Sequence, residues 1–381
     1  MRTFEIVIGV FIIITMLWDA FESVVLPRRV TRKFRVARIF YVSTWAIWSA
    51  IARAMRPSKF REIYLSVFGP LSILLLLTTW ALGMVLGFAL IHRGIGGAMS
   101  ATGEPVDFLL DLYLSGTTFF TLGLGDVVPR STAGRIAVVV ESGVGFGFLA
   151  LVIGYLPILY QAFSRREIAI SLLDARAGSP PSASEMLRRF GREENHPVLS
   201  EMMRDWERWS ASLLESHLSY PMLVYYRSQH DNQSWLAAIT AMMDTCALCI
   251  VALEKQRVLQ AKLTFAAARH AVTDIAQSIR AVPRAVQPDR LSPAELKRLV
   301  ETLCRAGTPF CSPSHWGPDA EKRLRELRDM YEPYVNGLSQ RLLVPLPPWI
   351  PEGEAHYNWH TTAWQRSLTG AAIVDDPDDH L

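Results

Sequence analysis

The stretch "TTFFTLGLGD", residues 117 to 126, has backbone chemistry suited to a monovalent cation. Its two glycines alternate with leucines, and glycine takes dihedral angles closed to other residues, so successive carbonyl groups can turn to one side. Thr121 adds a hydroxyl at the inner end of this column of oxygens. Four such strands around an axis could replace the hydration shell of a dehydrated alkali cation. Because one chain supplies one strand, this chemistry requires a homotetramer.

Irregular backbone is tolerated at membrane depth only where it is buried in protein or lines a water-filled path. The loop follows a predicted short helix, about residues 106 to 118, whose start is marked by Pro105 and Asp107. At about 1.5 Å per residue this helix is too short to cross about 30 Å of hydrocarbon. We expect it to enter from outside and stop partway, so that the negative end of its dipole favours a cation at the membrane centre.

Other segments are long and apolar enough to cross the bilayer as helices. They are residues 4 to 26, 69 to 91 and about 132 to 160. Residues 36 to 55 hold a run of only fourteen residues between Arg38 and Arg53, which is short for a span. We expect this segment to lie flat on the cytoplasmic interface, with Trp45 and Trp48 at headgroup depth. A fourth span there is the alternative.

The net charge of +3 is unevenly distributed. Residues 1 to 163 carry 14 Lys and Arg against 9 Asp and Glu, whereas residues 164 to 381 carry 25 against 27. Ten of the basic residues in the first half fall between Arg28 and Arg61 with no acidic residue among them, a pattern typical of a cytoplasmic loop. We therefore predict a multi-pass protein of the cell membrane with a cytoplasmic C-terminal half, and no nucleic-acid partner.

The stretch "TLGLGD", with "TTFF" before it and "VVP" after it, resembles the signature of the potassium channel family, whose usual filter is TVGYGD. In that family a pore helix precedes the filter, a Pro follows it, a Gly-Arg pair opens the inner helix and a hinge glycine lies further on. These features fall here on residues 107 to 118, Pro129, Gly134-Arg135 and Gly145. The resemblance covers roughly residues 66 to 163. It implies a potassium-permeable pore, with K+ as the permeant ion, whose filter is Thr121, Leu122, Gly123, Leu124, Gly125 and Asp126.

Leu124 departs from the family pattern, which usually has Tyr at this position. In the family that Tyr hydroxyl bonds to aromatic residues of the pore helix and braces the filter, and leucine has no hydroxyl. Tyr113 stands where one of those aromatic partners would be. The carbonyl column survives this change, but its stiffness depends on other contacts. A weakly selective monovalent cation channel is therefore the alternative to a potassium-selective one.

The predicted inner helix carries two candidate gating hinges, Gly145 and Pro157. Glycine weakens a helix and proline removes one of its hydrogen bonds, so the helix could bend at either position. Close packing through small residues would also explain Gly145 and its neighbours Gly143 and Gly147. We favour Gly145 as the hinge because its distance from the filter fits the family.

Carboxylates within the spans are functional candidates by default. Asp19 and Glu22 lie on one face of the first helix, where pairing with Arg28 and Arg29 or solvation at the interface would explain them without a special function. Glu141 lies deeper, in the inner helix. It either hydrogen-bonds behind the filter or faces the cavity.

After Tyr160 the sequence is that of a soluble helical domain, with a linker-like "RAGSPPSAS" at residues 176 to 184. Residues 235 to 253 are apolar apart from Asp244. We predict a buried helix of a bundle rather than a span, because a carboxylate at the membrane centre is costly.

Four cysteines lie in this half, where a reducing cytoplasm argues against disulfides. With His315 they form a weak zinc candidate, but cysteine in an apolar helix behaves as a small hydrophobe and core packing is favoured. These cysteines are Cys246, Cys249, Cys304 and Cys311. His356 and His360 share a helical spacing without the Glu of a metalloprotease motif.

We therefore predict an all-α fold in which membrane helices with a re-entrant pore helix and filter precede an α-helical cytoplasmic domain. The expected parts are an N-terminal span at 1–26, a basic cytoplasmic or interfacial segment at 27–65, a pore domain at 66–163 and a helical cytoplasmic domain with a Pro-rich acidic tail at 164–381. The inner helices and the cytoplasmic domain would gate a cation channel that needs no cofactor and is not an enzyme. A membrane-anchored cytoplasmic sensor or enzyme is the alternative, although no triad spacing or phosphate loop supports it. The gating stimulus and any cytoplasmic ligand stay open.

Overall fold

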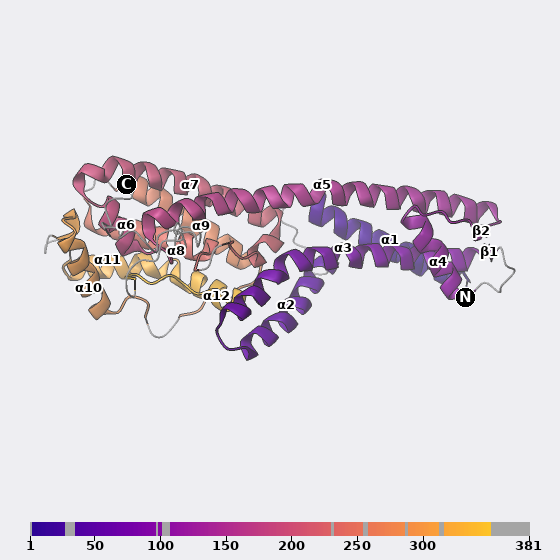
Figure 1. The fold of residues 1–381 in the computed structure, drawn as a ribbon, viewed down its shortest axis with the longest axis horizontal. Helices are drawn as coiled ribbons and strands as arrows, with labels where there is room; N and C mark the ends of the chain where they lie inside the picture. The colour runs from indigo at the N-terminus through magenta and orange to yellow at the C-terminus, as the bar shows by residue number, and fades with distance from the viewer. Residues whose placement is uncertain are drawn as a thin grey trace, which may run out of the picture. The chain divides into compact units, whose positions relative to one another are not determined.

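The computed structural model describes residues 2–26, 35–96, 98–100, 107–229, 232–253, 258–285, 289–311 and 316–351. Within these residues the chain is helical apart from two short strands and the connecting turns, so the fold is all-α as predicted (Figure 1). The chain divides into two compact units. The first comprises Met1–Ser164 and Glu215–Arg227, and the second comprises Arg165–Leu214 and Ser228–Leu381.

Long apolar helices make up the first unit. They are α1 (Arg2–Ala20) with its π-helical continuation η1 (Phe21–Val25), α2 (Val36–Ala54), α3 (Lys59–Ile95), the short α4 (Phe108–Phe119) and the first part of α5 (Thr132–Ala177). The three predicted spans lie within Arg2–Val25, Lys59–Ile95 and Thr132–Ala177, each long and apolar enough to cross a membrane. Helices α3 and α5 are longer than predicted, because helical residues continue beyond the apolar stretch of each.

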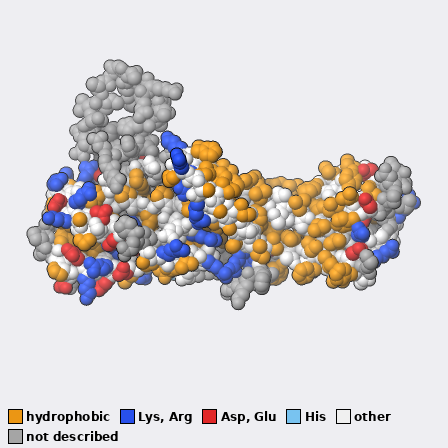
Figure 2. Space-filling view, turned by 90° about the horizontal axis from the view of Figure 1, so that it is seen from below, with side chains coloured by type: hydrophobic (Ala, Val, Ile, Leu, Met, Phe, Trp, Pro, Cys, Tyr) orange, Lys and Arg blue, Asp and Glu red, His pale blue; other side chains and the backbone are white. Residues whose placement is uncertain are grey.

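The exposed surface of this unit is apolar, as a lipid environment requires. Figure 2 shows hydrophobic side chains along the middle of the long helices, with acidic and basic side chains at the end of these helices near the N-terminus and over the second unit. Phe11 of α1 is 70% exposed and Val139 of α5 is 72% exposed. The comparison with the second unit indicates that the two parts of the chain are suited to different solvents.

Helices α1 and α3 approach each other closely through glycines. A Cβ atom on Gly9 would lie 2.4 Å from the carbonyl oxygen of Gly87, and a Cβ atom on Gly94 would lie 2.4 Å from a side-chain carbon of Ile6. Any larger residue at these positions would push the helices apart. Small residues allow this kind of close backbone packing between membrane helices.

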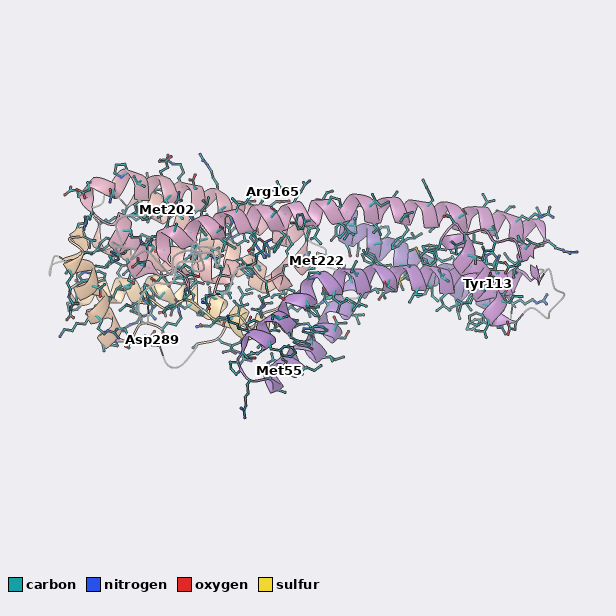
Figure 3. The ribbon with its side chains drawn as sticks, viewed as in Figure 1. Met55, Tyr113, Arg165, Met202, Met222 and Asp289 are labelled. Atoms are coloured by element: carbon teal, nitrogen blue, oxygen red, sulfur yellow. The ribbon has the colours of Figure 1, made fainter. Side chains whose placement is uncertain are left out.

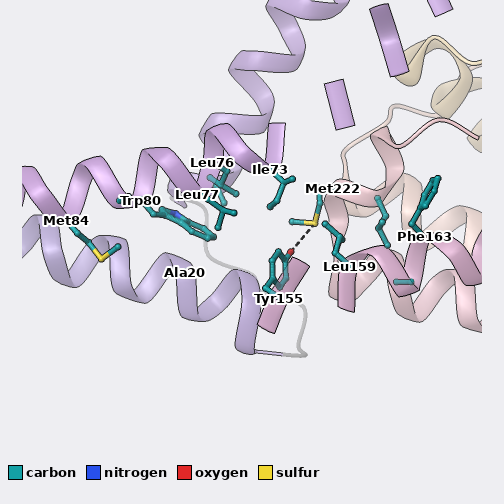
Figure 4. Packing of buried hydrophobic residues seen from close by; sticks show 14 of the residues in the cluster. Ala20, Ile73, Leu76, Leu77, Trp80, Met84, Tyr155, Leu159, Phe163 and Met222 are labelled. Carbon is teal, nitrogen blue, oxygen red and sulfur yellow. Dashed lines mark hydrogen bonds between the residues drawn. The ribbon is translucent and has the colours of Figure 1, made fainter. Parts of the chain in front are cut away.

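The core of the first unit includes a segment from much later in the chain. Met222 and Leu223 of the 3-10 helix η3 (Pro221–Tyr225) are buried with Trp80 of α3 and with Tyr155 and Leu159 of α5 (Figure 4). The Tyr155 hydroxyl lies 3.4 Å from the sulfur of Met222. Residues Glu215–Arg227 therefore return to the membrane helices, which the sequence did not predict.

Helix α2 packs against α3 through aromatic side chains. Trp45 is 2% exposed, and its ring centroid lies 4.8 Å from that of Phe68 and 4.9 Å from that of Tyr225. Trp48 stacks on Tyr64 with centroids 4.4 Å apart. The indole of Trp45 thus fills the space between α2, α3 and η3 rather than standing on an exposed face of α2, and its depth in the membrane stays a prediction.

The second unit is a helical bundle. After the end of α5 it contains α6 (Ala183–Phe190), η2 (Glu193–Asn195), most of α7 (His196–Ser219), α8 (Trp235–Ala252), α9 (Leu259–Ser278), α10 (Pro293–Arg305), η4 (Pro309–Cys311), α11 (Pro318–Asp329) and α12 (Glu332–Leu342). Helix α8 lies inside it, with 89% of its apolar window buried. The Asp244 carboxylate accepts a hydrogen bond from Arg290 at 2.7 Å and another from the Tyr331 hydroxyl. This explains how α8 tolerates a charge, and it agrees with the predicted buried helix.

Candidate functional site

The short helix α4 stands at the start of the candidate site. The Asp107 carboxylate caps it by accepting a hydrogen bond from the Leu110 backbone N–H at 2.9 Å. The helix has 12 residues, about 18 Å at about 1.5 Å per residue, so it cannot cross a bilayer. Leu114 and Phe119 are buried and fix it against its neighbours. The predicted short helix is thus present within one or two residues of its predicted ends.

The loop after α4 has an alternating backbone. The dihedral φ is +58° at Thr121, +58° at Gly123 and +78° at Gly125. Positive φ at every second residue turns successive carbonyls toward one side, unlike a β-strand, where they alternate. Glycine adopts this conformation easily, but for β-branched Thr121 it is an outlier of the kind that clusters at functional sites.

Backbone N–H groups of the loop are bonded to the end of α4. Leu122 and Gly123 both donate to the carbonyl of Thr117, at 2.7 and 3.3 Å, and Thr121 donates to Thr118 at 3.0 Å. Within the described part of the chain, no hydrogen bond reaches the carbonyl oxygens of residues 121–125. The N–H groups of residues 121–123 therefore hold the loop against α4, and the carbonyls of residues 121–125 are left to accept from or coordinate something else.

The outer end of the loop is tied to α4 by a side-chain hydrogen bond. The Tyr113 hydroxyl donates to Oδ2 of Asp126 at 2.7 Å, and Figure 3 shows Tyr113 on α4. Oδ1 of the same carboxylate accepts from the Val127 N–H at 3.1 Å. Strand β2 (Val127–Pro129) then pairs antiparallel with β1 (Ala98–Ser100). Tyr113 thus contacts the candidate filter through Asp126. The sequence had indicated only that Leu124 lacks the hydroxyl that would bond to an aromatic residue such as Tyr113.

Gly145 of α5 lies against the backbone at the end of α4. A Cβ atom at this position would lie 1.9 Å from the carbonyl oxygen of Phe119, far inside van der Waals contact. By contrast, Gly143 and Gly147 have open space where a Cβ would be. Close packing therefore accounts for Gly145, which was the alternative to a hinge, and Pro157 lies inside the continuous helix α5.

Glu141 lies behind the loop and is fully buried. Its Oε2 is 2.8 Å from Nε2 of His92 on α3, and its Oε1 contacts Oγ of Ser115 on α4. The Ser115 hydroxyl also lies 2.8 Å from the carbonyl oxygen of Val85. Of the two predicted placements, the structure gives the one behind the loop. Its partners were not predicted, because His92 and Ser115 are distant in sequence and neither belongs to a recognisable motif.

Asp19 and Glu22 are buried near the end of α1. Oδ2 of Asp19 accepts hydrogen bonds from Trp80 Nε1 and from the Ala37 N–H, both at 2.9 Å. Arg35 lies 3.5 Å from Glu22 and 4.0 Å from Asp19. Among the described residues Arg35 is the arginine beside these carboxylates, and their burial excludes the predicted alternative of solvation. Arg28 and Arg29 lie outside the described residues.

Among the described residues, no group of three His, Cys, Asp or Glu side chains comes close enough to hold a metal ion. Cys246 and Cys249 are buried in α8, and burial raises the pKa of both thiols. Cys304 is partly exposed. The side chain of Cys311, and His315, His356 and His360, lie outside the described part of the chain.

Sequence comparison relates this part of the chain to a known class of protein. Residues 74–162 match a sequence family described as "Ion channel". An uncharacterized membrane protein of Bacillus subtilis (strain 168), YdjJ, is 23% identical over 181 residues, which are 47% of this chain and 52% of that protein. The chain thus spans about half the length of this curated relative. No solved structure matches the chain. The matches support an ion-channel domain, which includes the loop and its supporting helices, within a membrane protein.

Proposed function

We propose that four copies of the chain form a cation channel that conducts K+ through the carbonyl oxygens of Thr121–Gly125. The observation that carries this proposal is the positive φ at every second residue of the loop. It directs neighbouring carbonyls to a common side, which a cation filter requires and an ordinary turn does not. The negative end of the α4 dipole adds to the attraction for a cation.

The tetramer is supported by apolar side chains that one copy leaves uncovered. Leu122 and Leu124 are 62% and 63% exposed, although they flank the glycines of the filter. On α5, Phe146 is 66% exposed. Association of copies around the filter would cover these side chains, and one strand per copy needs four copies to surround an ion.

Potassium selectivity rests on how firmly the filter is held. Leu124 has no hydroxyl with which to hold the filter, but the Tyr113–Asp126 hydrogen bond and the hydrogen bonds from the loop to Thr117 hold it instead. A weakly selective monovalent cation channel is the second candidate, favoured by the missing hydroxyl at Leu124.

We further propose that residues 164–381 are cytoplasmic and that they gate the pore together with the inner helices. The basic segment before α3 supports this orientation. A cytoplasmic ligand would act through this part of the chain. The competing proposal, a membrane anchor for a sensor or enzyme, gives no reason for the alternating loop.

The test is K+ and Na+ flux into liposomes that contain the purified full-length protein. Wild type should conduct K+ faster than Na+, and Gly123→Ala should abolish flux, because alanine disfavours φ of +58°. Gly116→Ala is the matched control, since Gly116 is helical and has open space around its Cβ position. Equal K+ and Na+ flux would replace the potassium channel with the weakly selective one. No flux from wild type would favour the anchor.

A further inference from the structure

The buried contacts of Glu141 contain more hydrogen-bond acceptors than the neighbouring serine can serve. The Ser115 hydroxyl has one hydrogen, yet it lies within bonding distance of both the Val85 carbonyl oxygen and Oε1 of Glu141. If that hydrogen goes to Val85, the contact with Glu141 needs a proton on the carboxyl group. If Glu141 is a carboxylate, the serine hydrogen turns to it and leaves Val85.

These two arrangements connect α4 to different helices. With Glu141 protonated, its O–H donates to Ser115 and the Ser115 O–H donates to Val85 of α3, so α4 is bonded to both α3 and α5. With Glu141 ionised, Ser115 donates to Glu141 of α5 alone. One proton therefore adds or removes the hydrogen bond between α4 and α3, while His92 can donate from Nε2 to Oε2 of Glu141 in both cases.

We propose that Glu141 is a positioning residue for the filter, whose proton decides whether Ser115 anchors α4 to α3. The proposal rests on the proposed channel function, because α4 carries the loop at its C-terminal end. The side chains of Glu141, Ser115 and His92 are each less than 5% exposed, so water does not compete for these hydrogen bonds. The Val85–Ser115 bond lies one helical turn before Phe119, where the loop begins.

Other charged groups lie near this cluster, and a pH response caused by them must be distinguished from one caused by Glu141. On α4, Asp111 is buried one turn before Ser115 and interacts electrostatically with His92, Arg93, Asp107 and Glu5. On α3, Arg93 pairs with Glu5 of α1 at 3.3 Å. A pH response that arose from Asp111 or Glu5 would not depend on the side chain at position 141.

The test measures rubidium uptake by proteoliposomes buffered to the same pH on both faces. From about pH 4, near the ordinary pKa of a glutamate carboxyl group, to about pH 8, wild-type uptake should fall as Glu141 loses its proton. The expected decrease in rubidium uptake is about two- to tenfold, because one hydrogen bond shifts an equilibrium by about this factor. Glu141→Gln should show the low-pH uptake at every pH, because the amide N–H donates to Ser115 permanently and its oxygen accepts from His92.

Matched variants separate positioning from general stability. Ser115→Ala should remove the pH response and hold uptake at the high-pH value. Ser72→Ala also deletes a buried hydroxyl, bonded at 2.8 Å to a carbonyl of its own helix, and should leave the profile unchanged. Asp111→Asn should keep the response. A wild-type uptake that is independent of pH, or a Glu141→Gln profile equal to that of wild type, would overturn the proposal. Absence of uptake at every pH would instead count against the channel itself.

Discussion

At the scale of single residues, Tyr113 shows how the proposed filter, with leucine between its glycines, is held in place. Its hydroxyl bonds to Asp126, the last residue of the candidate filter, from a position on α4 one turn after Leu109. The brace therefore acts at the outer end of the loop rather than at position 124. Selectivity in such a filter depends on the position and field strength of the carbonyls, which this bond helps to fix.

Tyr113→Phe should lower the ratio of K+ to Na+ flux while leaving conduction intact. The substitution removes only the hydroxyl that donates to Asp126, so the backbone of the loop keeps its other bonds. The measurement is the flux ratio in proteoliposomes. Tyr160→Phe is the control, because Tyr160 is 64% exposed and its hydroxyl has no hydrogen bond among the described residues. An unchanged ratio in Tyr113→Phe would show that the brace has no part in selectivity.

At the scale of elements, the contact between α4 and α5 decides what Gly145 does. The carbonyl of Phe119 occupies the space that a side chain at position 145 would need. Sequence reasoning favoured a hinge there, over close packing, because glycine weakens a helix and the distance to the candidate filter fits the family. A hinge and a close contact both call for glycine, and the position of the Phe119 carbonyl supports the close contact.

Gly145→Ala should destabilise the protein by about 1–3 kcal/mol, the usual effect of an extra methyl group in a tight contact. It should also reduce flux, since the displaced atoms belong to the residue just before the loop. Thermal unfolding in detergent measures the first effect and liposome flux the second. Gly143→Ala, with open space at its Cβ, is the control and should change stability little. Altered gating with unchanged stability in Gly145→Ala would favour the hinge instead.

Sequence reasoning predicted those elements whose signals are local. Apolar length identified the three spans, and Asp107 marked the start of α4. The alternation from Leu122 to Gly125 identified the loop. Sequence reasoning did not find the partners of the buried carboxylates, because Asp19 bonds to Trp80 and Glu141 bonds to His92 across long stretches of chain. Positive φ at Thr121 was also not predictable, since threonine rarely adopts it.

At the scale of the whole molecule, the first unit is not a continuous piece of sequence. The run "PMLVYY" at residues 221 to 226 is apolar and begins with proline, which was the available signal that it belongs to a core. Leu223 is 1% exposed within the cluster that also contains Tyr155 and Leu159 of α5. The membrane helices therefore depend on residues that follow α5 by more than forty positions.

Leu223→Ala should destabilise the first unit by about 2–5 kcal/mol, because it leaves a cavity in a packed core. The expected result is a lower midpoint of thermal unfolding for the purified protein. Leu263→Ala is the matched control, since Leu263 of α9 is 46% exposed. Equal midpoints for the two variants would show that the returning segment contributes little to the core.

The glycine contact between α1 and α3 affects how much of each helix is exposed to lipid. Only 22% of the apolar window of the first helix is buried, against 56% for α3, so α1 shields part of α3 from lipid. If four copies assemble as proposed, we expect annular lipid to meet α1 before it meets α3. We therefore expect changes in bilayer thickness or acyl-chain composition to reach the channel first as a tilt of α1, transmitted to α3 through Gly9 and Gly87.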